Sequence, residues 1–179
     1  MYNAPMNIGD PAPDFSLKNV DGKAYSLASF KDAKALVVIF SCNHCPYVMA
    51  YEDRMIELQK DYEGKGARLV AVNSNDADNY PEDSFDKMVA RAKEKGFNFP
   101  YLRDDSQQVA KAYGATHTPH LFVFDRDGEL AYTGKIDDNW QDAGAVKSRF
   151  LRDALDDILS NKRPRLAETH AIGCTIKWK

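Results

Sequence analysis

Two cysteines separated by two residues are the feature of this sequence best suited to chemistry. Cys42 and Cys45 stand in the segment VVIFSCNHCPYVM, directly after an apolar run and directly before Pro46. At this spacing in a turn, two sulfurs lie within disulfide reach, so one thiol can attack a substrate and the other can resolve the mixed disulfide. Half of a zinc site and two ordinary buried thiols are the alternatives, although the sequence has no second C-x-x-C to complete a zinc site.

The position of the pair in the chain favours the redox interpretation. The apolar, β-branched run at 35–40 predicts a buried strand, and Pro46 suits the first turn of a helix. At such a junction the first sulfur can sit at the helix N-terminus, where the dipole and free N–H groups stabilise a thiolate. His44 would favour the thiolate further if protonated and would make the disulfide a better oxidant. An exposed histidine without a tuning role is the alternative.

The composition excludes several other classes of protein. The chain has 179 residues, 44% of them apolar and 28% charged, which predicts one globular domain over residues 1–179. A net charge of -3 argues against a nucleic-acid partner. The sequence starts without a basic and apolar leader, and no stretch approaches the roughly 18 apolar residues of a membrane span, so we expect a cytoplasmic protein without membrane association. In a reducing compartment, a close cysteine pair indicates catalysis or metal binding.

The elements that must position the pair can be read from Gly, Pro and the apolar spacing. DFSL and AYSL around a DG turn predict a hairpin over 14–27. Apolar residues three and four apart predict a helix over 46–64, and ARLVAVN at 67–73 predicts another buried strand. A second helix is predicted to open at Pro81 and to stop at Gly96. This order of strand, helix, strand and helix implies a parallel unit.

The last third of the chain changes character. LFVFD and ELAYTG around RDG predict an antiparallel hairpin over 121–134, followed by a last helix from about Asp142 to Ser160. The predicted inward face of this helix consists of Val146, Phe150, Ala154, Leu155 and Ile158. Residues 161–179 form a tail without a clear period, apart from an alternation of apolar residues near its end that suits an edge strand or a packed arm.

Three segments together give the sequence a family resemblance. IGDPAPDFSL is similar to the opening of peroxiredoxins, CNHC stands where thioredoxins carry C-x-x-C, and YGATHTPHLFVFDRDGELAYTG is similar to the segment around the family's cis-proline. The sequence therefore resembles the thioredoxin-like superfamily, in the branch of peroxiredoxins and redoxin-type (AhpC/TSA) thiol:disulfide oxidoreductases. The resemblance implies an α/β thioredoxin-like fold, with a central mixed β-sheet flanked by helices, an N-terminal β-hairpin extension and an irregular C-terminal tail.

By the same resemblance, Pro119 is expected to be a cis-proline preceded by Thr118. This loop would lie against the cysteine pair and offer backbone groups to an extended substrate. His117 and His120 flank the loop, so both can approach the sulfurs, with plain hydrogen-bonding roles as the alternative.

The two branches of the superfamily assign the cysteines differently. In a thioredoxin-type reaction, Cys42 is the attacking thiolate and Cys45 the resolving thiol, and this thiol:disulfide oxidoreductase is the predicted function. Peroxiredoxins carry T-x-x-C-P, which Cys45 and Pro46 match while Cys42 replaces the threonine. Ser41 stands where thioredoxins have tryptophan, and Leu36 where they bury an acid. The alternative function is a thiol peroxidase that reduces hydrogen or alkyl peroxides with Cys45, and in which Cys42 or Cys174 closes the disulfide.

Further expectations concern Cys174, metals and partners. Cys174 would resolve a sulfenate on Cys45 or pair transiently with Cys42, or else be a structural thiol in a docked tail.

A less favoured hypothesis is a copper- or zinc-handling protein, in which Cys42, Cys45 and His117 or His120 bind the metal. The favoured function needs no bound cofactor. Its expected partners are a protein or small-molecule thiol, disulfide or peroxide, and a thiol reductant.

Overall fold

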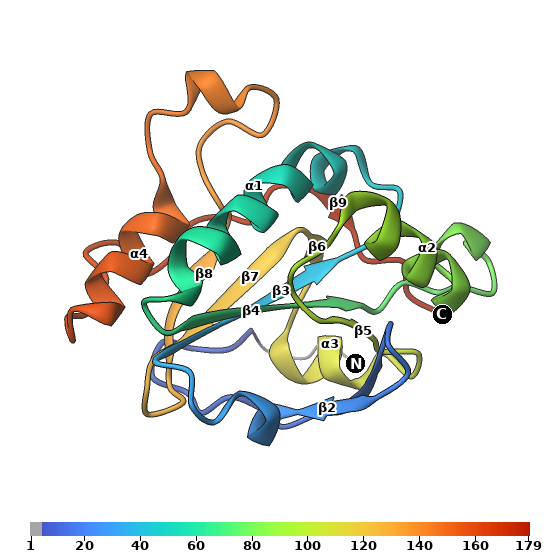
Figure 1. The fold of residues 1–179 in the computed structure, drawn as a ribbon, viewed down its shortest axis with the longest axis horizontal. Helices are drawn as coiled ribbons and strands as arrows, with labels where there is room; N and C mark the ends of the chain where they lie inside the picture. The colour runs from blue at the N-terminus through green and yellow to red at the C-terminus, as the bar shows by residue number, and fades with distance from the viewer. Residues whose placement is uncertain (1–4) are drawn as a thin grey trace.

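A seven-stranded mixed sheet forms the centre of the computed structural model, which describes residues 5–179 (Figure 1). Its strand order is β2-β1-β5-β4-β3-β7-β8. The strands are β1 (Ser16–Asn19), β2 (Ala24–Ser26), β3 (Ala35–Ser41), β4 (Ala67–Asn73), β5 (Tyr101–Arg103), β7 (His120–Phe124) and β8 (Leu130–Gly134). A second, two-stranded sheet pairs β6 (His117–Thr118) with β9 (Cys174–Thr175). The predicted central mixed sheet is therefore confirmed.

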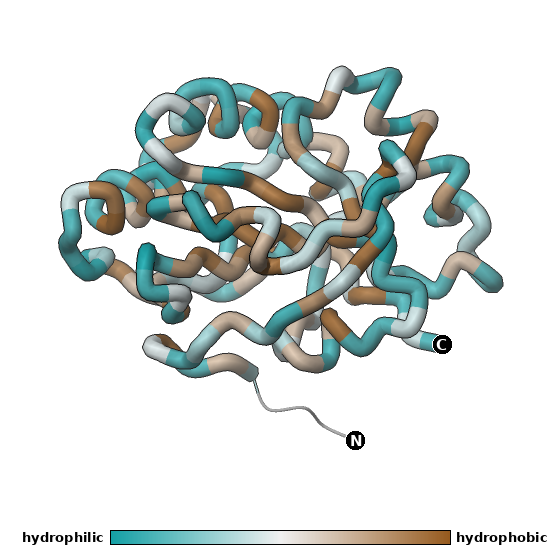
Figure 2. Tube along the Cα trace, turned by 60° about the horizontal axis from the view of Figure 1, so that its bottom comes forward, coloured by the Kyte–Doolittle hydropathy of each residue, from teal (hydrophilic) through white to brown (hydrophobic). Residues whose placement is uncertain are grey.

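The central strand β3 is buried along its whole length. It pairs parallel with β4 and antiparallel with β7, and all seven of its residues are buried. Val37 and Ile39 face one apolar core, whereas Val38 and Phe40 face a second core on the other side of the sheet. Figure 2 shows the apolar stretches along these central strands and polar stretches on the surrounding loops. The end of β3 is thus held rigidly from both faces.

Within residues 5–179, four α-helices cover the two faces of the sheet. They are α1 (Pro46–Glu63), α2 (Phe85–Lys95), α3 (Gln108–Tyr113) and α4 (Phe150–Leu159). Helices α1, α2 and α4 lie on one side and α3 on the other, together with the N-terminal segment (Figure 1). No helix within residues 5–179 is both long and apolar enough to cross a membrane.

The long elements of the sequence prediction are confirmed. The N-terminal hairpin, the strands at 35–41 and 67–73, the helix from Pro46, and the hairpin of β7 and β8 are all present. The parallel pairing of β3 and β4 is also confirmed. Three short elements, β5, β6 and α3, were not predicted, because three, two and six residues are too few to show a period.

Two predicted helix starts were wrong. Pro81–Asp83 forms a separate 3-10 turn, and α2 begins only at Phe85, because Ser84 is extended and its hydroxyl accepts a hydrogen bond from Lys87 N. In the last helix, α4 begins at Phe150. The segment before it makes only a short 3-10 turn, Ala143–Ala145, whose Gly144 N–H is bonded by the Asp142 carboxylate.

The predicted inward face of α4 is confirmed within the helix. Ala154, Leu155 and Ile158 are buried, and the half-buried Phe150 packs against the same core, whereas Val146 is half-buried and precedes the helix. Leu151, which the prediction omitted, is 1% exposed.

The tail beyond α4 follows the edge and then the end of the sheet. Ala167 and Thr169 bond the backbone of Thr133 on edge strand β8. The tail then adds β9 to β6 and continues to Lys177, whose carbonyl accepts from Asp76 N beyond the end of β4. The tail therefore crosses the end of the sheet where β3 ends and the two cysteines follow.

Candidate active site: three cysteines at the end of the central strand

The cysteine pair occupies the connection between β3 and α1. Cys42 directly follows the last residue of β3, and Cys45 is the N-cap residue of α1, with Pro46 in the first helical position. Both cysteines are buried, with 2% and 1% of their surface exposed, and they pack against Val48 of α1. The strand and the helix thus fix the two sulfurs in one apolar cluster.

The loop of β6 and β7 closes the site from the opposite side. The Thr118–Pro119 peptide bond is cis, as the family resemblance implied. Thr118 contacts both sulfurs, because its hydroxyl lies 3.5 Å from Cys42 Sγ and its carbonyl accepts from the protonated Cys45 thiol at 3.5 Å. Thr118 therefore lies where the resemblance placed it, against the cysteine pair, and it precedes the cis-proline Pro119.

Cys174 brings a third sulfur into the site from the far end of the chain. Its Sγ lies 2.7 Å from Cys45 Sγ. In β9, Cys174 stands opposite Thr118, and Thr175 stands opposite His117. The three cysteines are free thiols. The structure therefore brings together Cys42, Cys45 and Cys174 around the Thr118 backbone.

The environment makes Cys45 the most acidic of the three thiols. Its pKa is lowered well below that of a free cysteine, chiefly by the hydrogen bond from the Cys42 thiol. Burial opposes this effect, while the Cys174 thiol and the backbone N–H of Val48 in the first turn of α1 add to it. These contacts therefore favour ionisation of Cys45 over ionisation of Cys42.

Cys42 and Cys174 hold their protons more tightly than a free cysteine. The pKa of Cys42 is raised by the interaction with Cys45, then by burial and by the negative charge of Asp83. Burial raises the pKa of Cys174 as well, and the Cys45 thiolate adds to that shift. The sequence had placed the thiolate on Cys42, whereas these contacts favour Cys45.

Comparison with known proteins identifies the family. The model of the Redoxin family matches residues 7–148, which is most of the chain. The chain belongs to the Redoxin family. The thiol-disulfide oxidoreductase ResA of Geobacillus thermodenitrificans is 29% identical over 125 residues, which cover 69% of this chain and 66% of that protein. Protein FixW of Rhizobium leguminosarum is 26% identical over 157 residues, 78% of this chain and 70% of FixW.

Two solved structures share the fold over nearly the whole chain, and a third shares it over a large part. A hypothetical protein of Sinorhizobium meliloti superimposes with a TM-score of 0.93 at 41% identity, over 98% of this chain and 97% of that chain. An uncharacterised conserved protein of Geobacillus kaustophilus superimposes with a TM-score of 0.92 at 43% identity, over 100% of this chain and 94% of that chain. A Chlorobium tepidum protein described as a putative thiol:disulfide interchange protein DsbE superimposes with a TM-score of 0.63 at 25% identity. The match covers 72% of this chain and 84% of that chain. The redoxin has a thioredoxin-like α/β fold, and it shares its family with thiol-disulfide oxidoreductases.

A buried carboxylate that the sequence did not indicate lies next to the pair. Asp83, in the 3-10 turn before α2, is completely buried. It accepts hydrogen bonds from the backbone N–H of Asn43 at 2.8 Å and from the side-chain amides of Asn73 and Asn75 at 3.1 and 3.0 Å. In the sequence, Asp83 belongs to the acidic start of a predicted helix, a position that is normally exposed, so no local signal marked it.

His44 lies between the cysteines and this carboxylate. Its Nδ1 is 2.9 Å from Asp83 Oδ2, and its Nε2 is 3.6 Å from Glu82 Oε1. The approach to Asp83 is not aligned as a hydrogen bond, so Nδ1 has no hydrogen-bond partner among residues 5–179. The side chain is 35% exposed. His44 thus lies beside the buried Asp83 carboxylate and is itself partly exposed to solvent.

The metal set proposed from the sequence is not gathered by the fold. His117 Nδ1 contacts Thr116 Oγ1 at 2.7 Å, and His120 Nδ1 accepts from Thr116 N at 3.2 Å. Burial lowers the pKa of His120 to about 4. Within residues 5–179, the group of three potential ligands that does meet is Cys42, His44 and Asp83, whose ligand atoms lie within 4.8 Å of one another. In this group Asp83 accepts three hydrogen bonds from asparagines, whereas the buried Nδ1 of His44 has no hydrogen-bond partner among the described residues.

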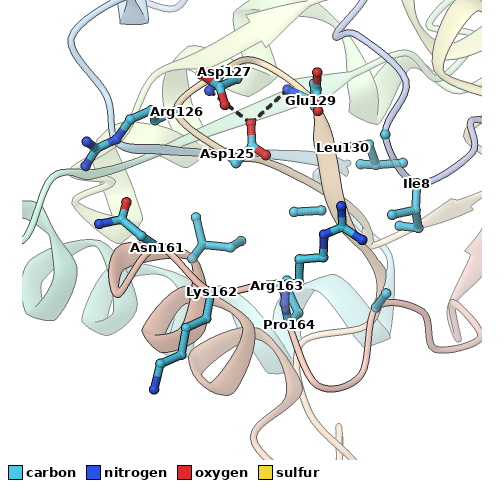
Figure 3. Close-up of a pocket in the computed structure, with 14 residues that line it drawn as sticks. Ile8, Asp125, Arg126, Asp127, Glu129, Leu130, Asn161, Lys162, Arg163 and Pro164 are labelled. Atoms are coloured by element: carbon cyan, nitrogen blue, oxygen red, sulfur yellow. Dashed lines mark hydrogen bonds between the residues drawn. The ribbon is translucent and has the colours of Figure 1, made fainter.

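A surface pocket of the redoxin lies away from the cysteines. It has a volume of about 570 Å³ and is lined by the turn between β7 and β8 and by the start of the tail (Figure 3). In that turn, Asp125 accepts from the backbone N–H groups of Asp127 and Glu129. The antiparallel register places His120 beside Phe40 and Phe124 beside Leu36, so this turn lies at the opposite end of the sheet.

Proposed function

We propose that this redoxin is a thiol:disulfide oxidoreductase that cycles Cys42 and Cys45 between dithiol and disulfide. The observation that carries the proposal is the meeting of both sulfurs at the N-terminus of α1, against the cis-proline loop. A thiolate stabilised at a helix N-terminus, with a second thiol in contact, supplies the two reactants of disulfide exchange. The relationship to thiol-disulfide oxidoreductases supports the same reaction.

In the proposed cycle, Cys45 attacks and Cys42 resolves. The Cys45 thiolate attacks one sulfur of a substrate disulfide and forms a mixed disulfide, while one substrate thiolate leaves. Cys42 then loses its proton and attacks Cys45 Sγ, which closes the Cys42–Cys45 bond and releases the second substrate thiolate. A thiol reductant regenerates the pair. This order reverses the roles expected from the sequence, because the contacts of Cys45 favour its thiolate.

Single-thiol variants test the assignment. In a Cys174→Ser background, Cys42→Ser leaves only Cys45, and Cys45→Ser leaves only Cys42. Each is mixed with oxidised glutathione, and the mass increase of the protein is followed with time. We expect the Cys45 protein to add glutathione faster. The opposite order would return the attacking role to Cys42. Failure of the Cys174→Ser protein to form any Cys42–Cys45 disulfide would overturn the proposal itself.

A thiol peroxidase is the second candidate, and the burial of the pair favours it. Cys42 and Cys45 are at most 2% exposed beneath the tail, so a small oxidant reaches them more easily than a protein segment does. In this reaction peroxide oxidises Cys45 to a sulfenate, and a neighbouring thiol closes the disulfide and releases water.

The rate of thiol loss after addition of hydrogen peroxide separates the two functions. For a peroxidase, loss is fast, is abolished by Cys45→Ser and begins normally in Cys42→Ser. Loss at the rate of an ordinary exposed thiol would leave disulfide exchange as the function.

A further inference from the structure

The C-terminal tail enters the active site as an added strand. Strand β9 pairs antiparallel with β6, and this pairing sets Cys174 opposite Thr118, the residue before the cis-proline. Ile176 N donates to Thr116 O at 3.0 Å, which continues the pairing beyond Thr175. The sulfur of Cys174 is therefore aimed by backbone hydrogen bonds rather than by the flexibility of a loose end.

A close approach of two backbones makes this docking depend on a glycine. A Cβ atom placed on Gly173 would lie 2.1 Å from Thr118 O and 2.7 Å from Thr118 C. No side chain fits there unless the tail moves away from the loop. The residue before Cys174 thus allows the contact between the tail and the cysteine pair.

The segment after Cys174 anchors the tail at the other side. Ile176 is 3% exposed and belongs to the apolar core that contains Val38 and Phe40. The backbone of Lys177 donates to Asn75 Oδ1 at 2.9 Å and accepts from Asp76 N at 2.8 Å. Several hydrogen bonds and a buried apolar side chain therefore hold Cys174 in place.

Exposure differs between the three thiols. Cys42 and Cys45 are almost completely buried, whereas Cys174 is half-buried and has solvent on one side. The sulfurs of Cys45 and Cys174 are 2.7 Å apart, compared with about 2 Å in a disulfide bond. An oxidant or reductant in solution meets Cys174 first, and a small movement joins Cys174 to Cys45.

We propose that Cys174 is a third redox-active residue, which forms a disulfide with Cys45 and so relays electrons between the buried pair and disulfides in solution. The inference rests on the proposed exchange at Cys42 and Cys45. It assigns the tail as the built-in partner strand of that exchange, in place of a segment from another protein.

The relay balances with an external disulfide RS–SR as oxidant. Cys174 loses its proton and attacks RS–SR, which gives Cys174–S–SR and releases RS⁻. The Cys45 thiolate attacks Cys174 Sγ, forming the Cys45–Cys174 bond and releasing the second RS⁻. Cys42 loses its proton and attacks Cys45 Sγ, and the leaving Cys174 thiolate is reprotonated. Two protein thiols are oxidised and RS–SR is reduced to two thiols, which take one proton from Cys42 and one from solvent.

Disulfide mapping in Cys42→Ser tests the central bond, because this variant stops the relay at the second step. After treatment with oxidised glutathione, we expect an intramolecular Cys45–Cys174 disulfide in the peptide map. Adding Gly173→Ala to Cys42→Ser should greatly slow formation of this bond, because the added methyl group displaces the tail. Gly64→Ala is the control, since no atom lies within 4 Å of its Cβ position. A free Cys174 in oxidised Cys42→Ser, or a Gly173→Ala rate equal to the control, would overturn the proposal.

The kinetics of Cys174→Ser test the relay in a protein whose docking is undisturbed. We expect oxidation of the Cys42–Cys45 pair by oxidised glutathione to slow by about tenfold or more, because the accessible thiol is lost. An unchanged or faster rate would mean that the tail only covers the pair. The yield of the Cys42–Cys45 disulfide at equilibrium reports separately on the proposed function, since a relay alters its rate and not its final amount.

Discussion

At the scale of single residues, Cys45 is the sulfur on which the other groups converge. It lies beside the Cys42 thiol, 2.7 Å from Cys174 Sγ and at the N-terminal end of α1, and each of these neighbours lowers its pKa. Cys42, in contrast, is buried beside the negative charge of Asp83. The difference between two neighbouring cysteines therefore comes from their contacts and not from their residue type.

This difference predicts the pH dependence of the thiolate. The ultraviolet absorbance of the thiolate in the native protein should persist well below pH ~8.5, the pKa of a free cysteine, and should disappear in Cys45→Ser. In Cys42→Ala the pKa of Cys45 should rise, because its principal hydrogen-bond donor is lost. A native titration curve that Cys45→Ser leaves unchanged would contradict this assignment.

The lowered pKa of Cys45 also makes the stability of the fold depend on pH. The folded pKa of Cys45 lies below its unfolded value, so its thiolate stabilises the fold fully above pH ~8.5, and this contribution is lost as the pH falls through the folded pKa. Cys42, whose pKa is raised, contributes in the opposite direction: its stabilisation is full below the unfolded pKa and is lost at high pH.

Asp83→Asn should change both the chemistry of Cys42 and the stability of the fold. Removal of the negative charge lowers the pKa of Cys42, so alkylation of Cys42 should accelerate at a fixed alkaline pH when Cys45 and Cys174 are serines. The new amide also presents a donor to groups that already donate, which leaves a buried group unsatisfied at a cost of about 1–3 kcal/mol. Urea denaturation measures that cost.

The control for Asp83 is Asp53→Asn, whose carboxylate is 83% exposed and pairs with Lys95 on the surface. An exposed ion pair of this kind contributes at most about 1 kcal/mol. If both variants unfold at the same urea concentration, the hydrogen-bond network around Asp83 is not a stabilising one.

At the scale of elements, the N-cap of α2 holds the segment that carries Asp83. Ser84 Oγ accepts from Lys87 N at 3.3 Å and ends the preceding 3-10 turn. Ser84→Ala should therefore lower the free energy of unfolding by about 1 kcal/mol, whereas Ser84→Asn should retain most of it, because asparagine is an equally good N-cap. Chemical denaturation of the three proteins compares these values. Equal losses in the two variants would exclude the cap as the cause.

The same elements show how far the sequence determines the fold. Helix α1 and strands β3 and β4 were predictable, because their apolar residues repeat over many positions. The start of α2 was misplaced, since Pro81 is also a good helix start, and only the extended backbone of Ser84 decides between them. The alternation near the end of the tail suggested an edge strand or a packed arm, and β9 is such a strand, but its partner β6 could not be predicted, because two residues pair only when the chain brings β6 beside them.

The candidate site, like the fold, could be predicted from the sequence only in part. Local patterns and the family resemblance indicated the C-x-x-C pair and the Thr-Pro loop, and the structure shows that the pair and the loop are in contact. For Cys174 the sequence left two alternatives open, a redox-active residue and a structural thiol, because no local pattern shows where the tail docks. Asp83 was missed, since its burial depends on asparagines from β4 and from the loops around it.

At the scale of the whole molecule, the tail belongs to the fold and not only to the site. It runs along β8, crosses the end of the sheet at β6 and ends beside the loop after β4, so it connects segments from both halves of the chain. Ile176 joins it to the apolar core on the α3 side of the sheet. Stability of the fold and coverage of the cysteines are therefore linked.

Ile176→Ala measures that link. Loss of a buried isoleucine side chain should lower the free energy of unfolding by about 2–5 kcal/mol. The same change should loosen β9, so that alkylation of Cys45 by iodoacetamide becomes faster under native conditions. Ile172→Ala is the matched control, because Ile172 lies on the same tail but is 45% exposed, and its loss should change stability by no more than about 0.5 kcal/mol. If Ile176→Ala destabilises the protein without exposing Cys45, the tail opens only when the whole domain unfolds, and the two roles of the tail form one cooperative unit.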